Sequence, residues 1–434
     1  MPRRRDVNVR VEHLTRVEGH GNIVLNVRRG TLQECRLDIV ESPRFFESML
    51  RQRPCLQVSH IASRICGICA VSHALASLKA TEEAMGIEAS EQTVLLRKLI
   101  LVGEQIQSHI LHIYFLAAPD FLGVGSVFPL INTEPELVRR ALRMKQLGND
   151  LCGVIGGRHI HPITLVPGGF TKVPSVESLQ NLRDRIEESY EDLNATVQTL
   201  KSVAIPKFER ETEYVALTSN DGFTFYDGDV RSSKLDEPVE PRFYQRVIHE
   251  SVVPHSSAKH VSGVDGPIMV GALARLNLNY DRLGERAKKA AAELGLSVPC
   301  YNPFMNTVAQ LVEVAECYDQ AMEIIETLAS EGLVDDRPRV IPQAGRGVGA
   351  VEAPRGTLYH EYTYDRDGRI TGANCTIPTN QNLANIEADM RDLVPTILDK
   401  DDDAIRLTLE MLVRAYDPCI SCSTHILDVR LVGK

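Results

Sequence analysis

The sequence predicts a mainly α fold of the α+β class: a helix-rich single unit around a central helical bundle, with a small antiparallel sheet at its amino end. Apolar and polar residues alternate near the amino end, whereas apolar residues recur at helical spacing through most of the rest. No low-complexity linker or repeat divides the 434 residues, and a content of 43% hydrophobic and 24% charged residues is typical of a compact globular protein. We therefore treat residues 1–434 as one domain.

The alternating segment covers residues 6–41, where glycines mark the turns of the expected sheet. A helical body is expected over about 60–425, followed by a tail at 426–434. Within the body, apolar spacing predicts helices at 60–85, 91–116, 136–144, 175–203, 282–294, 305–330, 382–393 and 402–416. Two stretches with turn-forming residues, 213–241 and 337–356, are expected to be irregular.

Charge and hydropathy exclude several classes of protein. The net charge of -10 and the lack of a basic patch with interleaved aromatics argue against a nucleic-acid-binding protein. No apolar run approaches the roughly 18 residues of a membrane-spanning helix. The opening MPRRRDVNV contains paired arginines, but charged residues follow where a signal peptide has an apolar stretch. We expect a cytoplasmic protein without a membrane span.

Four of the ten cysteines form two C-x-x-C pairs, Cys66 with Cys69 and Cys419 with Cys422. In a helical segment, Cys66, Cys69 and His73 would share one face and address one point. A zinc site usually has its two pairs much closer in sequence, and a redox pair would leave the second pair unexplained. Thiolates also suit softer transition metals such as nickel and iron. Spacing alone leaves all three kinds of site open and favours the last.

The two cysteine segments carry longer motifs, R-x-C-G-x-C-x-x-x-H at 64–73 and D-P-C-x-x-C-x-x-H at 417–425. Together, in this order and at this separation, they resemble the signature motifs of nickel-iron hydrogenase large subunits. Further matches are L-T-R-V-E-G-H at 14–20, P-R-F-F-E at 43–47, E-A-P-R-G at 352–356 and I-P-T-N at 377–380. The resemblance spans nearly the whole chain and is closest to the cytoplasmic bidirectional class.

This resemblance implies an enzyme that reversibly splits dihydrogen into protons and electrons. It implies a nickel-iron centre in which the iron carries one carbon monoxide and two cyanides. Cys66 and Cys419 would then be terminal ligands of nickel, while Cys69 and Cys422 would bridge to iron. Glu18 would take up the proton, because the family uses the glutamate of this motif as a base.

The resemblance assigns further residues around the metals. Arg355, with Asp417 beside it, would lie over the open side of the centre and polarise dihydrogen. The groups expected to bind the diatomic ligands or the cofactor are Thr379, Pro354 and His73. A second site for Mg²⁺ or Fe²⁺ would use Glu47, the backbone carbonyl of Cys375 and His425.

Electron transfer is expected to need partner proteins. Once the four ligands are assigned, no cysteine set for an iron-sulfur cluster remains, and no nucleotide-binding G-x-G-x-x-G motif is present. The family solution is a small subunit with iron-sulfur clusters, with further flavin or iron-sulfur subunits that serve a soluble acceptor such as NAD(P) or ferredoxin. The alternatives are a dihydrogen sensor and a metal-free electron-transfer subunit.

The match to the family pattern has two departures. Ser108 stands where many members carry an acidic residue near Arg355. The chain also continues for residues 426–434 beyond the histidine after which family precursors are commonly cut. Whether this tail is removed during maturation is left open by the sequence.

Overall fold

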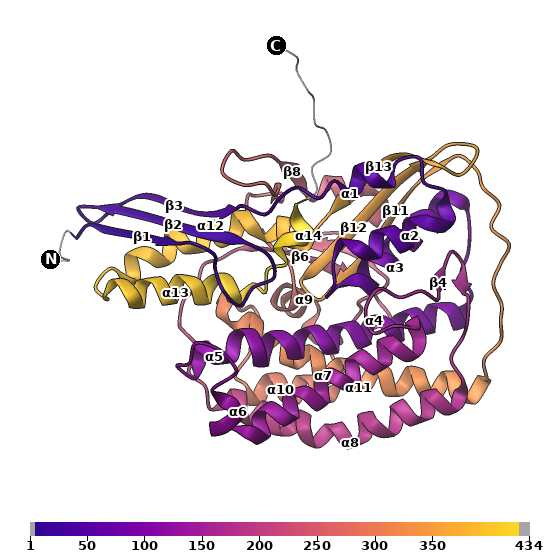
Figure 1. Ribbon diagram of the computed structural model, residues 1–434, viewed down its shortest axis with the longest axis horizontal. Helices are drawn as coiled ribbons and strands as arrows, with labels where there is room; N and C mark the ends of the chain where they lie inside the picture. The colour runs from indigo at the N-terminus through magenta and orange to yellow at the C-terminus, as the bar shows by residue number, and fades with distance from the viewer. Residues whose placement is uncertain (1–4, 425–434) are drawn as a thin grey trace, which may run out of the picture.

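The computed structural model describes residues 5–424, and helix is its dominant structure (Figure 1). The helices are α1 Phe46–Leu50, α2 Cys55–Ala62, α3 Ala70–Met85, α4 Glu91–Leu111, α5 Ala118–Phe121, α6 Leu130–Thr133, α7 Pro135–Gly156, α8 Val176–Lys201, α9 Ala272–Asn279, α10 Glu285–Glu293, α11 Asn306–Glu331, α12 Pro378–Ile397, α13 Asp402–Ala415 and α14 Ile420–Ser423. Together with several small sheets, they confirm the helix-rich α+β class. No helix within 5–424 is both long and apolar enough to cross a membrane.

The strands form small separate sheets. They are β1 Val7–Val11, β2 Gly21–Arg28, β3 Thr31–Ile39, β4 Leu165–Val166, β5 Gly169–Phe170, β6 Glu213–Thr218, β7 Asp229–Ser232, β8 His249–Ser251, β9 His260–Ser262, β10 Ile268–Met269, β11 Gly345–Ala353, β12 Gly356–Tyr364 and β13 Ile370–Thr376. The amino-terminal sheet β1-β2-β3 is antiparallel, as the alternation at 6–41 predicts. A second antiparallel sheet, β11-β12-β13, was not expected, so the body is not purely helical.

Three predicted segments need correction. The helix expected at 60–85 is interrupted: α2 ends at Ala62, a single 3₁₀ turn follows, and α3 begins only at Ala70. Cys66 has extended backbone angles (φ -142°, ψ 148°), so the first cysteine pair lies in a loop. The stretch expected to be irregular at 213–241 contains β6 and β7, and the one at 337–356 contains β11.

The interface between α3 and β11 explains why a glycine-rich stretch forms a strand here. A Cβ added to Gly349 would lie 1.9 Å from the carbonyl oxygen of Ala76, and one added to Gly347 would lie 2.1 Å from that of Ala80. Glycines at every second strand position thus face alanines at every fourth helix position. Only such small residues allow the helix and strand backbones to approach this closely.

Two groups of elements surround the cysteine segments. The long helices α4, α7, α8 and α11 pack against one another and form the lower half of the view in Figure 1. The amino-terminal sheet extends to the left, with α12 packed against β3 and α13 against β1. The alternating buried positions of β2, such as Ile23 and Leu25, explain this arrangement because one face of the sheet needs an apolar partner.

Candidate metal centre

Four buried thiols converge at one point. The Sγ of Cys66 lies 3.3 Å from that of Cys419, and the Sγ of Cys69 lies 3.6 Å from that of Cys422. All four sulfurs lie within 4.8 Å of one another, and none is in a disulfide. Hydrogen bonds from the other thiols, led by Cys419, lower the pKa of Cys66 well below its usual value. The two pairs, although distant in sequence, therefore form one set of soft donors.

The first pair is positioned by its loop and by the start of α3. The Sγ of Cys66 accepts hydrogen bonds from the backbone N–H groups of Ile68 (3.2 Å) and Cys69 (3.4 Å), so the backbone of the loop holds this sulfur in place. The carboxylate of Glu104 on α4 accepts the N–H groups of Val71 (2.6 Å) and Ser72 (2.9 Å). Glu104 thereby satisfies free N–H groups at the amino end of α3.

The second pair is positioned mainly by polar side chains. Asp417 adopts a left-handed backbone (φ 51°), which turns the chain after α13 into the cysteine segment. The hydroxyl of Thr379 accepts the N–H of Cys419 (2.9 Å), and the amide of Asn380 donates to the carbonyl of Ser423 (3.2 Å). Both side chains come from the first turn of α12. The orientation of α12 therefore decides where Cys419 and Cys422 lie.

Glu18 lies against the second pair. Its Oε2 accepts the N–H of Ser421 (3.0 Å) and lies 3.2 Å from the Sγ of Cys419, which donates to it. Its own backbone carbonyl accepts the N–H of Ile420 (2.9 Å). The next residue, Gly19, has a φ of +85°, and a Cβ there would lie 2.7 Å from Ile420. The glycine of the motif thus permits the close approach that brings Glu18 to the sulfur.

Arg355 is buried beside the sulfurs. Its Nε donates to the carbonyl of Asp417 (2.6 Å), and its Nη2 pairs with the carboxylate of Asp417 at 2.8 Å. A longer contact of 3.4 Å joins its Nη1 to the hydroxyl of Ser108. The Asp417 carboxylate also accepts from the amide of Gln310 (3.2 Å). The charge of Arg355 is therefore fixed in place by a carboxylate, as buried charges require.

A second network of buried charges lies next to the chain segment that carries Arg355. Arg275 forms ion pairs with Glu313 (2.6 Å) and Glu352 (2.9 Å), and all three side chains are fully buried. Arg275 also donates to the carbonyl of Pro354 (3.1 Å), while His109 lies 2.9 Å from Glu313. In this region acidic charge therefore comes from Glu313 on α11, because residue 108 is a serine and supplies none.

Glu47 has one buried oxygen that no other described group satisfies. Its Oε1 accepts the N–H of Cys375 (2.9 Å), whereas its Oε2 has no hydrogen-bond partner within 5–424. Burial raises the pKa of Glu47 to about 7. Such an orphaned oxygen fits a cation ligand, because leaving a buried polar atom unpaired is costly. His425, the third expected ligand, lies outside the described residues.

His73 does not share a helical face with Cys66 and Cys69, because these cysteines lie before α3 begins. Its Nδ1 lies 3.0 Å from the Nε2 of His360 on β12, and burial lowers the pKa of His73 to about 4. Its backbone N–H is bonded to the carbonyl of Cys69 (3.1 Å). The side chain therefore connects the first cysteine loop to the β11-β12-β13 sheet.

Sequence reasoning missed several residues that hold the site. Arg44, inside the P-R-F-F-E motif, donates to the carbonyls of Ile65 (2.6 Å), Arg64 (3.2 Å) and Ser421 (3.4 Å), so it joins the two cysteine segments. Glu104 and the network around Arg275 were also missed. For Glu104, Arg275 and Glu313 the only sequence signal is a charged residue inside a helix with many apolar residues, which indicates burial but names no partner. Glu352 stands in the E-A-P-R-G motif, on strand β11.

The donor set fits a nickel-iron centre. Four buried thiols of this kind suit soft transition metals, and no disulfide competes for them. The sequence profile of the nickel-dependent hydrogenases matches residues 44–135 and 217–425. These ranges contain all four cysteines.

The sequences of individual relatives align with this chain over almost its whole length. The chain is 32% identical over 421 residues to the alpha chain of sulfhydrogenase 1 from Pyrococcus furiosus, covering 96% of this chain and 98% of that protein. It is 34% identical over 463 residues to a subunit of the F420-non-reducing hydrogenase of Methanothermobacter marburgensis, covering 98% and 96%.

Solved structures share the fold. An NAD⁺-reducing [NiFe]-hydrogenase in the H₂-reduced state superposes with a TM-score of 0.87 at 30% identity, covering 96% of this chain and 99% of the other. A [NiFeSe] hydrogenase of Desulfovibrio vulgaris Hildenborough has the same fold with a TM-score of 0.77 at 23% identity, covering 97% and 100%. The chain therefore belongs to the nickel-dependent hydrogenase family, as a large subunit of a nickel-iron enzyme that acts on dihydrogen.

Proposed function

We propose that this chain cleaves dihydrogen heterolytically and reversibly at a nickel-iron centre held by Cys66, Cys69, Cys419 and Cys422. Cys69 and Cys422 would be shared with the iron, which would carry one carbon monoxide and two cyanides. When bound, the centre would supply the Lewis acidity that polarises dihydrogen and the redox capacity that takes up its two electrons. The convergence of four buried thiols, none of them in a disulfide, is the observation that carries this proposal.

Glu18 acts as the proton carrier in this proposal. The carboxylate takes a proton from the Sγ of Cys419, to which it is hydrogen-bonded at 3.2 Å. Glu18 is partly exposed whereas Cys419 is buried, so the carboxylate connects a dry site to the surface. A base in direct contact with the group it deprotonates satisfies the geometric requirement for general acid-base transfer.

Arg355 provides fixed positive charge beside the reacting sulfurs. The ion pair with Asp417 orients the guanidinium, and burial keeps the region dry, which strengthens its interaction with the negative thiolates. We propose that Thr379 and the backbone at Pro354 border the diatomic ligands, since the Thr379 hydroxyl retains its proton for donation. His73 would anchor the first cysteine loop from behind.

A second cation, Mg²⁺ or Fe²⁺, is proposed at Glu47. The unpaired Oε2 of Glu47 supports this assignment. The carbonyl of Cys375 and the side chain of His425 would complete the protein ligands, with water filling the remaining positions of an octahedron. Such an ion would tie the carboxyl-terminal segment to α1.

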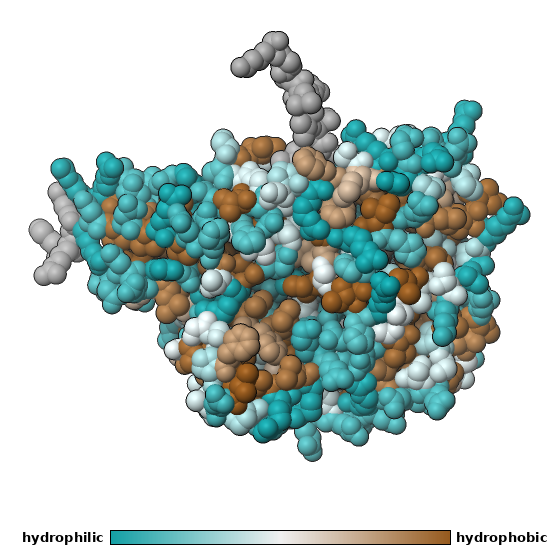
Figure 2. All heavy atoms as spheres, in the orientation of Figure 1, coloured by the Kyte–Doolittle hydropathy of each residue, from teal (hydrophilic) through white to brown (hydrophobic). Residues whose placement is uncertain are grey.

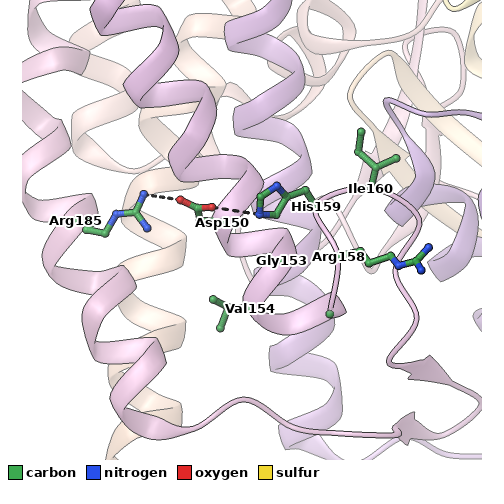
Figure 3. A pocket seen from close by; sticks show the side chains of 8 residues that line it. Asp150, Gly153, Val154, Arg158, His159, Ile160 and Arg185 are labelled. Carbon is green, nitrogen blue, oxygen red and sulfur yellow. Dashed lines mark hydrogen bonds and ion pairs between the residues drawn. The ribbon is translucent and has the colours of Figure 1, made fainter.

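Electrons are proposed to leave through an iron-sulfur small subunit that docks near the first cysteine loop. Gly67 and Arg64 in this loop are exposed, and His161 holds the loop through the carbonyl of Ser63 (2.9 Å). The segment before His161 lines an open cleft with α7 and α8, in which Asp150 pairs with His159 and Arg185 (Figure 3).

Two large apolar side chains are exposed in the segment between α4 and α7. Arg16 donates to the carbonyl of Leu116 (2.6 Å), which links the Glu18 motif to the segment that follows α4. In that segment Phe128 and Ile131 are 73% and 50% exposed. Hydrophobic residues of this region are visible at the lower left of the molecule in Figure 2. Large apolar side chains exposed together mark interaction sites.

The proposed route ends at a soluble acceptor such as NAD(P) or ferredoxin, reached through further flavin or iron-sulfur subunits in the cytoplasm. A relative in Cupriavidus necator is named an NAD-reducing hydrogenase subunit, with 26% identity over 465 residues. Together with the NAD⁺-reducing structure described above, this similarity supports a pyridine nucleotide as the acceptor.

The decisive experiment is metal analysis of the purified complex together with infrared spectroscopy. We expect nickel and iron in equal amounts and stretching bands of one carbon monoxide and two cyanides. The variant Cys66→Ser is expected to lose nickel and dihydrogen oxidation. Zinc in place of nickel and iron, without these bands, would overturn the proposal.

The partner surface is tested separately. Phe128→Asp and Ile131→Asp should weaken co-purification of the iron-sulfur subunit, because a charge in an apolar contact is costly. Ile341→Asp is the matched control, since Ile341 is 68% exposed and lies in the loop before β11. Equal loss of the partner in all three variants would contradict this docking surface.

A further inference from the structure

A second cluster of metal-binding side chains lies apart from the cysteines. His255, His260 and Glu387 each offer one ligand atom, and these atoms lie within 4.8 Å of one another. His255 lies in the loop between β8 and β9, His260 is the first residue of β9, and Glu387 lies on α12. None of the three has a part in the proposed hydrogenase chemistry.

The cluster has a buried group whose hydrogen-bonding capacity is unused. His260 is only 6% exposed, and its Nε2 has no partner among the residues that the structure describes. Its ring lies edge-on to that of His255, with centroids 5.5 Å apart. A buried imidazole nitrogen left unpaired costs free energy, which a bound cation would recover.

The other two ligands are held in place by neighbouring elements. The Nε2 of His255 lies 2.8 Å from the Oε1 of Glu387, and this oxygen also accepts the N–H of Leu37 on β3 (3.1 Å). The histidine loop is anchored to the end of β3, since Ser257 donates its N–H to Ile39 (3.0 Å) and its hydroxyl to Glu41 (2.7 Å). The ligands are therefore arranged before any ion binds.

From this geometry we propose that His255, His260 and Glu387 form a binding site for a divalent transition-metal ion such as Zn²⁺. Two imidazoles and one carboxylate are a donor set that zinc accepts, with water in the fourth position. With metal-ligand bonds of about 2.1 Å, tetrahedral ligands lie roughly 3.4 Å apart, so small side-chain rotations close the site. The side chain of His255 is 25% exposed, which leaves a path for ion and water.

The ion would act as a structural clamp. It joins the β8-β9 loop to α12, the helix whose first turn holds Cys419 and Ser423 through Thr379 and Asn380. Arg391 competes with the ion for the carboxylate of Glu387, because its guanidinium pairs with the Oε2 of Glu387 at 2.8 Å. The competing arrangement is a simple ion pair of His255 with Glu387, in which His260 only packs.

The test uses the assembled enzyme with its nickel-iron centre loaded, so that the four thiols are occupied. Zn²⁺ or Co²⁺ is added, excess ion is removed by dialysis, and bound metal is counted for the wild type, His260→Phe and Glu387→Gln. We expect one more ion per chain in the wild type than in either variant. Bound Co²⁺ should show visible d–d bands without thiolate charge transfer. Equal metal content in the three proteins would overturn the proposal.

Two further variants separate the site from general damage. His249→Ala removes an exposed histidine of the same hairpin and should retain the extra ion. Arg391→Met should tighten Zn²⁺ binding about two- to fivefold, since it removes a half-exposed competitor whose ion pair contributes up to about 1 kcal/mol. Unfolding cannot produce such a gain, so unchanged or weaker binding in Arg391→Met would contradict the site. Dihydrogen oxidation is expected to stay unchanged in His249→Ala and Arg391→Met, which keep the ion.

Discussion

The two cysteine pairs reach the same point by different physical means. Cys66 and Cys69 precede α3, which is pressed against β11 so closely that only glycine fits on the strand. Cys419 and Cys422 lie in a short turn whose backbone N–H groups donate to Thr379 and Glu18 and whose Ser423 carbonyl accepts from Asn380. Backbone packing therefore places the first pair, whereas polar side chains place the second.

This difference predicts different responses to substitution. Close packing has no room to adjust, so a single added methyl group in it lowers stability. A hydrogen-bonded turn instead depends on particular donors and acceptors, and substitutions there act first on the geometry of the sulfurs. Each pair supplies two of the four proposed ligands, so the proposed chemistry depends on both pairs.

The largest effect is expected from the sulfurs themselves. Cys66→Ser and Cys419→Ser should each abolish dihydrogen oxidation, because a neutral hydroxyl does not replace a thiolate on nickel. The measurement is dihydrogen oxidation with an artificial electron acceptor, alongside nickel content. Near-normal turnover with nickel still bound in either variant would refute the proposed ligand set.

The next effect tests the close packing behind the first pair. Gly349→Ala should lower the free energy of unfolding by about 3 kcal/mol, because its Cβ would lie 1.9 Å from the Ala76 carbonyl. Gly372→Ala on β13 is the matched control, since its Cβ would lie 3.7 Å from the nearest atom. Denaturant unfolding compares the two variants. Equal denaturant midpoints would show that the close contact between β11 and α3 does not limit stability.

A smaller effect is expected from the carboxylate beside the second pair. Glu18→Gln keeps an oxygen for the Ser421 N–H but removes the ionisable group, so turnover should fall roughly 10²-fold. Metal content should not change. Conversion of para- to ortho-dihydrogen should survive while dihydrogen/deuteron exchange with solvent collapses, because only the latter needs a proton to leave.

The outcome of this experiment separates two roles of Glu18. If both exchange reactions fell together with the metals present, Glu18 would act on cleavage or on the site structure. If neither fell, the proton would leave by another route, and His20 or His73 would be tested next.

The smallest effect tests a single hydrogen bond to the second pair. Thr379→Val removes the acceptor of the Cys419 N–H and should cost about 2 kcal/mol of stability. Thr379→Ser restores the hydroxyl and should recover most of it. Thermal unfolding of the two variants gives the comparison. A loss that serine does not recover would point to the methyl group of Thr379 instead.

Much of the fold followed from local patterns. The amino-terminal sheet and helices such as α8 and α11 were predictable. Apolar residues recur every second position in the strands and about every 3.6 positions in the helices. The break before α3 was not, because 60–85 has helical spacing throughout and only the cysteine loop interrupts it. Strand β11 was missed because glycines usually disfavour strands.

Local motifs pointed to the four cysteines that the structure brings together. Cys66, Cys69, Cys419 and Cys422 stand in such motifs, and their thiol chemistry already favoured a soft transition metal. What holds these sulfurs in place became visible only in the folded chain. The bridging role of Arg44, the carboxylate of Glu104 at the start of α3 and the three-residue cluster at His260 all join segments distant in sequence. Such contacts depend on how elements pack, which no local pattern encodes.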